Sequence, residues 1–334
     1  MNQRLYAYAS AIKSEVKSVI EDQKSILFEL LSYHFGWTNS ETIEEEPTPI
    51  PHFESLLCMH LSRIQGNDYS DTLQLAVALE LITNFIEIHN DVQNGGQGAH
   101  SNSIWWSWGP AQAINAGDGL HALARTAILN HPNLKNDHIL LAIKNLDSSC
   151  LSLFEGQFTD INFRDQMEIE ESSFIDMLER KSGSMPSCSS YLSTIPAEHL
   201  TTQNRDLYAE IGRDLGVALQ INRDIIQIWG PEDTGITRDN LMLRRKTLPL
   251  IYALNHSEET TKRKILTAYM SRVMDDEAGE TLVNIMTECG AKEYAQSKAQ
   301  SLYLSSINKL KELNDNITDT DLKVLGSLYE DFSK

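Results

Sequence analysis

The stretches Leu81–Asn94, LITNFIEIHNDVQN, and Leu219–Gly230, LQINRDIIQIWG, decide the fold of this chain. In each stretch apolar residues recur at intervals of three and four, which is typical of a helix with a buried face. Each stretch also carries one aspartate toward its polar end, Asp91 in the first and Asp224 in the second. The same combination of an apolar helix and a polar end therefore occurs twice.

Both polar ends have the spacing of a metal-binding frame. A helix places positions i, i+1 and i+4 on one side of a turn, so three acids there can hold Mg²⁺. The outer positions are Asn90 and Asn94 in the first frame and Arg223 and Gln227 in the second. An amide oxygen brings no charge to a metal and an arginine repels it. The residues therefore predict at most weak binding of Mg²⁺ by the central aspartates.

Helical periodicity covers most of the chain, and no alternating strand pattern of useful length interrupts it. Pro110 suits the first turn of a helix, and Pro186 is expected to kink its helix. The sequence predicts an all-α fold in one domain, 1–334, with an N-terminal helical segment (1–35) and an acidic, proline-broken loop (36–52). Helices are predicted over roughly 4–35, 71–91, from 110, 135–163, 172–194, 204–229, 247–274, 291–313 and 318–332.

Charge and cysteine content exclude several classes of protein. The net charge of −19 argues against nucleic acid or an anionic membrane as the main partner. The four cysteines are scattered without ligand spacing, which is typical of a reduced intracellular protein. No apolar run approaches the length of a membrane span. We therefore expect a cytoplasmic protein with no membrane span.

Six segments, in this order, resemble segments of the trans-isoprenyl diphosphate synthases, or polyprenyl synthetases, which are relatives of class I terpene synthases. The resemblance extends from about residue 30 to about residue 255. The segments are Ile88–Asn94, Ala111–Asp118 (AQAINAGD), Glu155–Asp160 (EGQFTD), Lys181–Gly183 (KSG), Leu219–Gly230 and Lys246–Ile251 (KTLPLI).

The resemblance implies an all-helical bundle around a deep apolar cavity, usually in a homodimer. In the family, two aspartate-rich motifs hold Mg²⁺ ions that remove diphosphate from an allylic substrate. The resulting carbocation is attacked by a second isoprenoid or by an internal double bond. The expected ligand is therefore a short isoprenoid or prenyl diphosphate, and the expected partner is a second copy or an active relative in a heterodimer.

The departures from the family fall on charged positions. The family has a Gly-Lys-Arg segment before its second helix, where this chain has Pro49–Glu54 (PIPHFE). It has paired arginines after the first motif, where this chain has Gly98–Ser101 (GAHS), and a lysine after the second motif with no clear match near Gly235–Thr237. Lys181 survives. Losing acids and cations together makes ordinary magnesium-dependent elongation the weakest expectation.

The resemblance assigns catalytic positions to Asp91, Asp224, Arg223 and Lys181, with the two aspartates as the candidate metal ligands. The guanidinium of Arg223 could bind a phosphate or carboxylate directly, or could pair with an acid of the chain. Lys181 could contact a diphosphate, or could neutralise Asp160 or Asp224. Both alternatives stay open for each residue.

Five further residues are candidates for substrate contact. Phe85 lies a little over one turn before Asn90, where a bulky family residue floors the pocket and limits prenyl length. A histidine just before the first motif could act as a base or could simply pack. The set of candidates is Phe85, His89, Gln157, Asp160 and Gln220.

Three functions fit these observations. The leading hypothesis is a divergent enzyme that transfers or cyclises a short prenyl group with altered or lost magnesium–diphosphate chemistry. The alternative is a catalytically silent subunit that pairs with an active prenyl diphosphate synthase. The third is an ordinary magnesium-dependent short-chain synthase.

Overall fold

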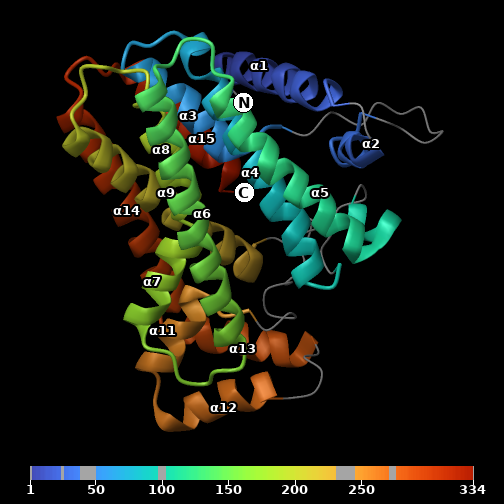
Figure 1. Cartoon of the computed structure of the whole chain (residues 1–334). Coiled ribbons are helices and arrows are strands. Elements are labelled where there is room, and N and C mark those ends of the chain that lie inside the picture. Colours follow the sequence, from blue (N-terminus) through green and yellow to red (C-terminus); the bar gives the residue numbers. More distant parts are fainter. Residues whose placement is uncertain are drawn as a thin grey trace. The chain divides into compact units, whose positions relative to one another are not determined.

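The computed structural model describes residues 2–23, 26–37, 50–96, 103–230, 245–270 and 276–333, and every regular element in these ranges is helical (Figure 1). The all-α prediction is therefore confirmed. The helices are α1 (Gln3–Glu21), α2 (Ile26–His34), α3 (Phe53–Ile64), the 3-10 turn η1 (Tyr69–Asp71), α4 (Leu73–Gln93), α5 (Ile104–Leu129), α6 (Asn136–Arg164), α7 (Glu171–Lys181), α8 (Ser184–Leu192), α9 (Thr202–Trp229), α11 (Leu248–His256), α12 (Glu259–Met270), α13 (Asp276–Glu288), α14 (Ala291–Leu313) and α15 (Asp319–Phe332).

The chain divides into two compact units. Unit 1 comprises Met1–Leu146, Ser189–Arg205 and Asn316–Leu328, and unit 2 comprises Asp147–Cys188, Asp206–Asp315 and Tyr329–Lys334. The helices α6, α8, α9 and α15 each contribute residues to both units. The expectation of one domain stays a prediction, and most of the expected loop 36–52 lies outside the described residues.

Several predicted boundaries are wrong. The expected helix over 4–35 is two helices, and so are those over 172–194 and 247–274. The second break occurs at Gly183, where an added Cβ would lie 2.5 Å from the carbonyl oxygen of Glu179 and 2.7 Å from Cγ of Arg213. Pro186 does not kink a helix, because it lies in the first turn of α8, where a missing N–H costs little.

Unit 1 is organised around α4, which packs along α5 and also contacts α1 and α3. Most α4 side chains from Leu75 to Phe85 are buried, because the helix is surrounded by other helices. At Gly109 the backbone of α5 takes φ 80° and ψ 174°, and the helix resumes at Pro110. This restart agrees with the expected role of Pro110 at a helix beginning.

One face of α4 is polar from Glu80 to Asp91. Glu80, Asn84, Glu87 and Asp91 follow one another at intervals of four, three and four and therefore share this face. Glu80 and Asn84 are buried. The stripe connects the beginning of α3 with the first motif at the end of α4.

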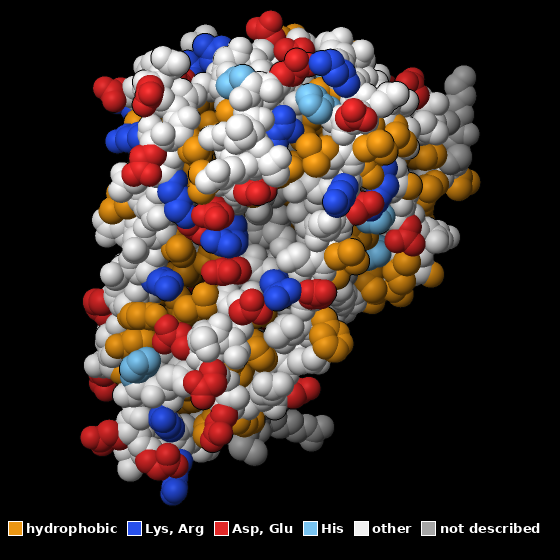
Figure 2. Space-filling view, turned by 60° about the vertical axis from the view of Figure 1, so that its left-hand side comes forward, with side chains coloured by type: hydrophobic (Ala, Val, Ile, Leu, Met, Phe, Trp, Pro, Cys, Tyr) orange, Lys and Arg blue, Asp and Glu red, His pale blue; other side chains and the backbone are white. Residues whose placement is uncertain are grey.

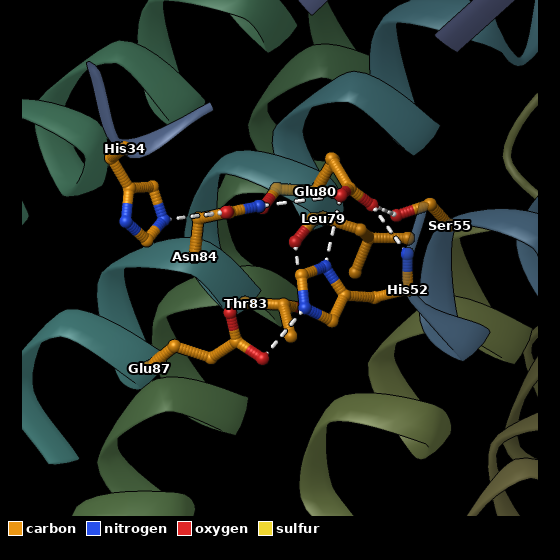
Figure 3. Close-up of polar contacts among 8 residues, drawn as sticks. All are labelled: His34, His52, Ser55, Leu79, Glu80, Thr83, Asn84 and Glu87. Atoms are coloured by element: carbon orange, nitrogen blue, oxygen red, sulfur yellow. Dashed lines mark hydrogen bonds and ion pairs between the residues drawn. The ribbon is translucent and has the colours of Figure 1, made fainter. Parts of the chain in front are cut away.

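Glu80 and Glu87 of this stripe bind His52, the residue that precedes α3 (Figure 3). Nδ1 of the imidazole lies 2.9 Å from Oε1 of Glu80, and Nε2 lies 2.9 Å from Oε1 of Glu87. The backbone N–H of His52 and the hydroxyl of Ser55 both donate to Oε2 of Glu80, at 2.9 and 2.5 Å. Nδ2 of Asn84 donates to Oε1 of Glu80. We call His52, Ser55, Glu80 and Glu87 the His52 cluster.

The geometry of the His52 cluster fixes its charges. Both ring nitrogens face carboxylates, which only accept, so the ring is a doubly protonated imidazolium. Burial alone would lower the pKa of His52, but the charges of Glu80 and Glu87 outweigh it and raise that pKa well above 6.5. Burial opposes ionisation of Glu80, yet the charge and hydrogen bonds of His52 hold the pKa of that carboxyl below 4.5.

Unit 2 contains a separate apolar core between α11, α12, α13 and the beginning of α14. Its buried members are Ile228, Leu250, Ala253, Ile265, Tyr269, Leu282, Ile285, Met286 and Ala291. The side chain of Trp229, at the end of α9, packs against this core and donates from Nε1 to the hydroxyl of Thr287 at 2.9 Å. The end of the helix that carries the second motif is thereby fixed.

Charges on the described surface are dispersed. Within the described ranges, no helix is both long and apolar enough to cross a membrane. On the face shown in Figure 2, acidic side chains are scattered with single Lys and Arg side chains between them. The described residues of this face form no continuous basic patch.

A close approach of α6 and α7 in unit 2 depends on Gly156. A Cβ at this position would lie 2.8 Å from the carbonyl carbon of Arg180 and closer still to the amide nitrogen of Lys181. We expect Gly156→Ala to separate the two helices and to lower the free energy of unfolding by about 1–3 kcal/mol. In the control Gly279→Ala, the added Cβ meets nothing within 4 Å. Chemical unfolding of both variants checks this, and equal stabilities would contradict it.

The His52 cluster predicts a pH dependence of stability. The raised pKa of His52 means that its contribution is complete below about pH 6.5 and is lost as pH rises through the folded-state pKa. We therefore expect His52→Gln to be roughly 2 kcal/mol less stable than the wild type at pH 6. The difference should shrink at alkaline pH.

Urea unfolding across a pH series measures this effect, with His199→Gln as the control, because His199 is exposed. The control should follow the wild type at every pH. A constant difference between His52→Gln and the wild type across the series would show that the imidazolium does not carry the effect.

Candidate active site

The first motif lies at the C-terminal end of α4 in unit 1. The carboxylate of Asp91 accepts a hydrogen bond from the hydroxyl of Ser103 at 2.6 Å, and its backbone carbonyl accepts from the N–H of Gly96 at 2.8 Å. Asn94 forms the C-cap of the helix. The aspartate is therefore oriented by the chain that follows the motif.

Phe85 lies about one turn before the motif and His89 directly before it, and both rings lie between α4 and α5. Their ring centroids are 4.5 Å apart, and the ring of His121 on α5 lies 4.9 Å from that of Phe85. A Cβ at Gly117 would lie 2.5 Å from Nε2 of His89 and 3.3 Å from Cδ2 of Phe85. The absence of a side chain at this glycine makes room for both rings.

The other contacts of His89 are weak. Its Nε2 lies 3.4 Å from the carbonyl oxygen of Ile114 and 3.7 Å from the carboxylate of Asp118. The imidazole is 27% exposed. Packing against Phe85 is therefore its closest described interaction, and its role as a base stays a prediction.

The second motif lies in α9 within unit 2. Asp224 is buried, and Nε2 of Gln220 donates to its Oδ1 at 2.9 Å. Burial raises the pKa of Asp224 to about 7, against the opposing effects of the Gln220 hydrogen bond and of the Lys181 and Arg245 charges. The carboxyl group is thus only partly ionised at neutral pH. Gln220 and Asp224 thus form a hydrogen-bonded pair, and their roles in substrate contact and catalysis stay predictions.

Lys181 reaches the same region from the end of α7. Its Nζ lies 2.7 Å from Oδ2 of the buried Asp160 on α6. Nη2 of Arg164 lies 3.9 Å from the same oxygen. Gln157, one turn before Asp160, is half-buried. Of the two alternatives for Lys181, the structure shows the pairing with Asp160, and contact with a diphosphate stays a prediction.

Arg223 contacts the end of α15. Its Nε donates to the backbone carbonyl of Phe332 at 2.9 Å, close to the end of α15. The neighbouring Asn222 donates to the hydroxyl of Tyr329 at 2.8 Å. A guanidinium near a helix C-terminus is favoured by the helix dipole. The structure therefore gives this arginine a capping contact that the sequence did not predict.

The donor chemistry of these residues does not fit a cluster of Mg²⁺ ions. Each motif offers one carboxylate, and that of Asp224 is buried and only partly charged. Across the described ranges, no group of three or more His, Cys, Asp or Glu side chains could hold a metal ion. Mg²⁺ requires several hard, charged oxygen ligands because it gives up its waters reluctantly. We therefore derive no step through a metal.

The His52 cluster is the arrangement near the first motif that the sequence did not reveal. The polar stripe on α4 was visible as polar residues at helical spacing in an apolar helix. The partner of this stripe, His52, could not be recognised from the sequence, because His52 and Glu80 are 28 residues apart in the chain.

The model of the polyprenyl synthetase family matches residues 52–286, which include both motifs. The chain is 29% identical over 313 residues to a geranylgeranyl diphosphate synthase of Mycobacterium tuberculosis, covering 92% of this chain and 87% of that protein. A geranylgeranyl diphosphate synthase of Methanosarcina mazei is 27% identical over 253 residues, with 75% and 76% covered.

A solved structure of similar fold is the polyprenyl synthetase from Streptomyces coelicolor A3(2). The TM-score is 0.87 at 24% identity, and 98% of each chain is covered. At this identity the likeness concerns the fold alone. The family model spans well over half of this chain and includes both motif-bearing helices. This chain therefore belongs to the polyprenyl synthetase family.

Proposed function

We propose that this chain is an enzyme of the short-chain prenyl synthase type that acts on a short prenyl diphosphate with altered diphosphate chemistry. The family match across both motif-bearing helices carries the proposal. The names of its relatives, geranylgeranyl diphosphate synthases among them, support the substrate class. The reaction is prenyl transfer or cyclisation.

The position of Phe85 supports a short substrate. Its ring is almost fully buried between the rings of His89 and His121, beside Gly117. An isoprenoid tail that enters beside the first motif would meet these rings about one helical turn from Asp91. A longer tail would have to displace an aromatic ring from a packed position, which costs several kcal/mol.

The side chains of the two motifs support altered chemistry. Asn90 and Asn94 supply no negative charge, Arg223 makes a capping contact, and Asp224 is buried. Lys181 is the cation of this set that could meet a diphosphate, at the expense of its bond to Asp160. These residues favour handling of the diphosphate by side chains of the protein.

A second candidate is the ordinary magnesium-dependent short-chain synthase. The names of the relatives favour this function. The loss of acids and cations from the family motifs made it the weakest expectation from the sequence. Membership of the family supports the use of Mg²⁺ in general, whereas the ligands of this chain do not. The silent subunit remains a prediction from the sequence.

We also propose a second copy of the chain as a partner. On α6, Leu151, Phe154, Phe158 and Ile161 share one face at intervals of three, four and three, and their exposed fractions are 63, 39, 68 and 39%. Contiguous apolar side chains of this size are typical of an interaction surface. A partner protein with a charged surface would not match the apolar side chains of this stripe.

Incubation of the purified chain with Mg²⁺, isopentenyl diphosphate and short allylic diphosphates tests the enzymatic proposal. We expect conversion of an allylic diphosphate with little or no elongation. The variant Asn90→Asp/Asn94→Asp/Arg223→Asp/Gln227→Asp should recover little elongation, because the diphosphate-binding cations would still be absent. No conversion by the wild type would contradict the proposal, and robust elongation by this variant would favour the ordinary synthase.

The dimer is tested by sedimentation of Phe158→Asp. A buried, unpaired carboxylate at the centre of the stripe should dissociate the dimer into monomers. Leu304→Asp is the control, because Leu304 is 50% exposed on α14, away from α6. It should remain dimeric. A monomeric wild type, or a Phe158→Asp dimer of unchanged affinity, would contradict the assignment.

A further inference from the structure

We infer that this chain binds one diphosphate-bearing substrate, held in unit 2, and that an internal carboxylate closes the beginning of α3 in unit 1 to a second one. This inference rests on the proposed function and narrows its substrates. The excluded reaction is the joining of two prenyl diphosphates.

The beginning of a helix is ordinarily a place for an anion. Its first N–H groups lack partners within the helix, and the positive end of the helix dipole lies there. At α3, the anion is already supplied by the chain: Oε2 of Glu80 accepts from the backbone N–H of His52 and from the hydroxyl of Ser55 (Figure 3). The Glu80 carboxylate is buried and cannot leave without exposing its donors.

The remaining charges of the His52 cluster repel an anion. The imidazolium of His52 is held between two carboxylates at 2.9 Å each, so its positive charge is already neutralised. The cluster as a whole carries one net negative charge. The side chain of Glu87 is 41% exposed, and a diphosphate approaching from solvent would meet it first.

Other cations are scarce in this part of unit 1. Between Lys24 and Arg125 the sequence contains a single basic residue, Arg63. Arg63 lies in the last turn of α3, at the opposite end of the helix from His52. Lys13 of α1 is close enough to feel the charge of Glu80.

Unit 2, in contrast, has described cations around the second motif. Lys181 and Arg164 both approach the single carboxylate of Asp160, at 2.7 and 3.9 Å. The charges of Lys181 and Arg245 both act on Asp224. Described cations therefore lie beside both acidic side chains of this region. A diphosphate could replace Asp160 as the partner of Lys181, since cations bind phosphate oxygens by charge-assisted hydrogen bonds.

One diphosphate per chain restricts the reaction. The allylic C–O bond breaks, and its electron pair leaves with the diphosphate. The carbocation then takes the π electrons of a double bond, and a proton lost from the adjacent carbon to the departed diphosphate restores neutrality. The double bond must belong to the same prenyl chain or to a neutral, apolar acceptor. The inferred substrates are therefore a single prenyl diphosphate with or without an uncharged alkene.

Calorimetric titration of the full chain with inorganic pyrophosphate, with and without Mg²⁺, tests the inference. We expect one equivalent bound per chain and a loss of affinity of about tenfold or more in Lys181→Gln. Lys309→Gln is the control, because Lys309 pairs with Glu210 and Asp214 and not with the motif. Its affinity should equal that of the wild type.

The location of the bound anion is read from the histidine ring signals in NMR spectra. Those of His52 should not move when pyrophosphate is added. Thermal unfolding verifies that Lys181→Gln is folded, and Lys181→Arg, which retains the charge, should bind pyrophosphate nearly as well as the wild type.

Two outcomes would overturn the inference alone: two equivalents bound per chain, or shifts of the His52 signals that persist in Lys181→Gln. An unchanged affinity in Lys181→Gln would also overturn it. The absence of any pyrophosphate binding would contradict the proposed function as well, so the two failures are distinguishable.

Discussion

A carboxylate that is removed from water must be paired and hydrogen-bonded, because its desolvation otherwise costs several kcal/mol. This constraint operates in both units. In unit 1 the buried Glu80 takes its partners from the beginning of α3 and from His52. In unit 2 the buried Asp160 takes Lys181. Each pairing joins two helical segments.

The two pairings differ in whether they leave positive charge that an incoming anion could bind. The positive charge of His52 is shared by two carboxylates, and Glu80 fills the anion position of α3. In unit 2, Arg164 and Lys181 share one carboxylate. An incoming anion can therefore compete for cations in unit 2 but meets net negative charge in unit 1. The polyprenyl synthetase fold is thus retained while the charges at its motifs are redistributed.

Most of the long helices were predictable from the sequence. The long segments of α4, α6, α9, α14 and α15 follow apolar periodicity, and their existence was expected. The helix α3 was not among the predicted helices; it is short, and nearly all of its side chains are buried. The break before α8 was missed because it depends on contact between Gly183 and Arg213 of α9, which lies far along the chain.

The candidate site was predictable to a similar degree. The pairing of Lys181 with Asp160 was one of two open alternatives, and the proximity of Gln220 to Asp224 follows from helical spacing. The contact of Arg223 with the end of α15 and the binding of His52 by α4 were not predictable, because both join residues that tertiary packing brings together.

We propose that the few charged side chains of the two motifs cannot assemble three magnesium ions on a diphosphate. A crystal of the full chain soaked with Mn²⁺ and pyrophosphate tests it most directly, because anomalous scattering locates each ion. The account predicts pyrophosphate beside Lys181 without an ordered cluster of ions at Asp91 and Asp224. Three ordered ions joining pyrophosphate to both aspartates would contradict it.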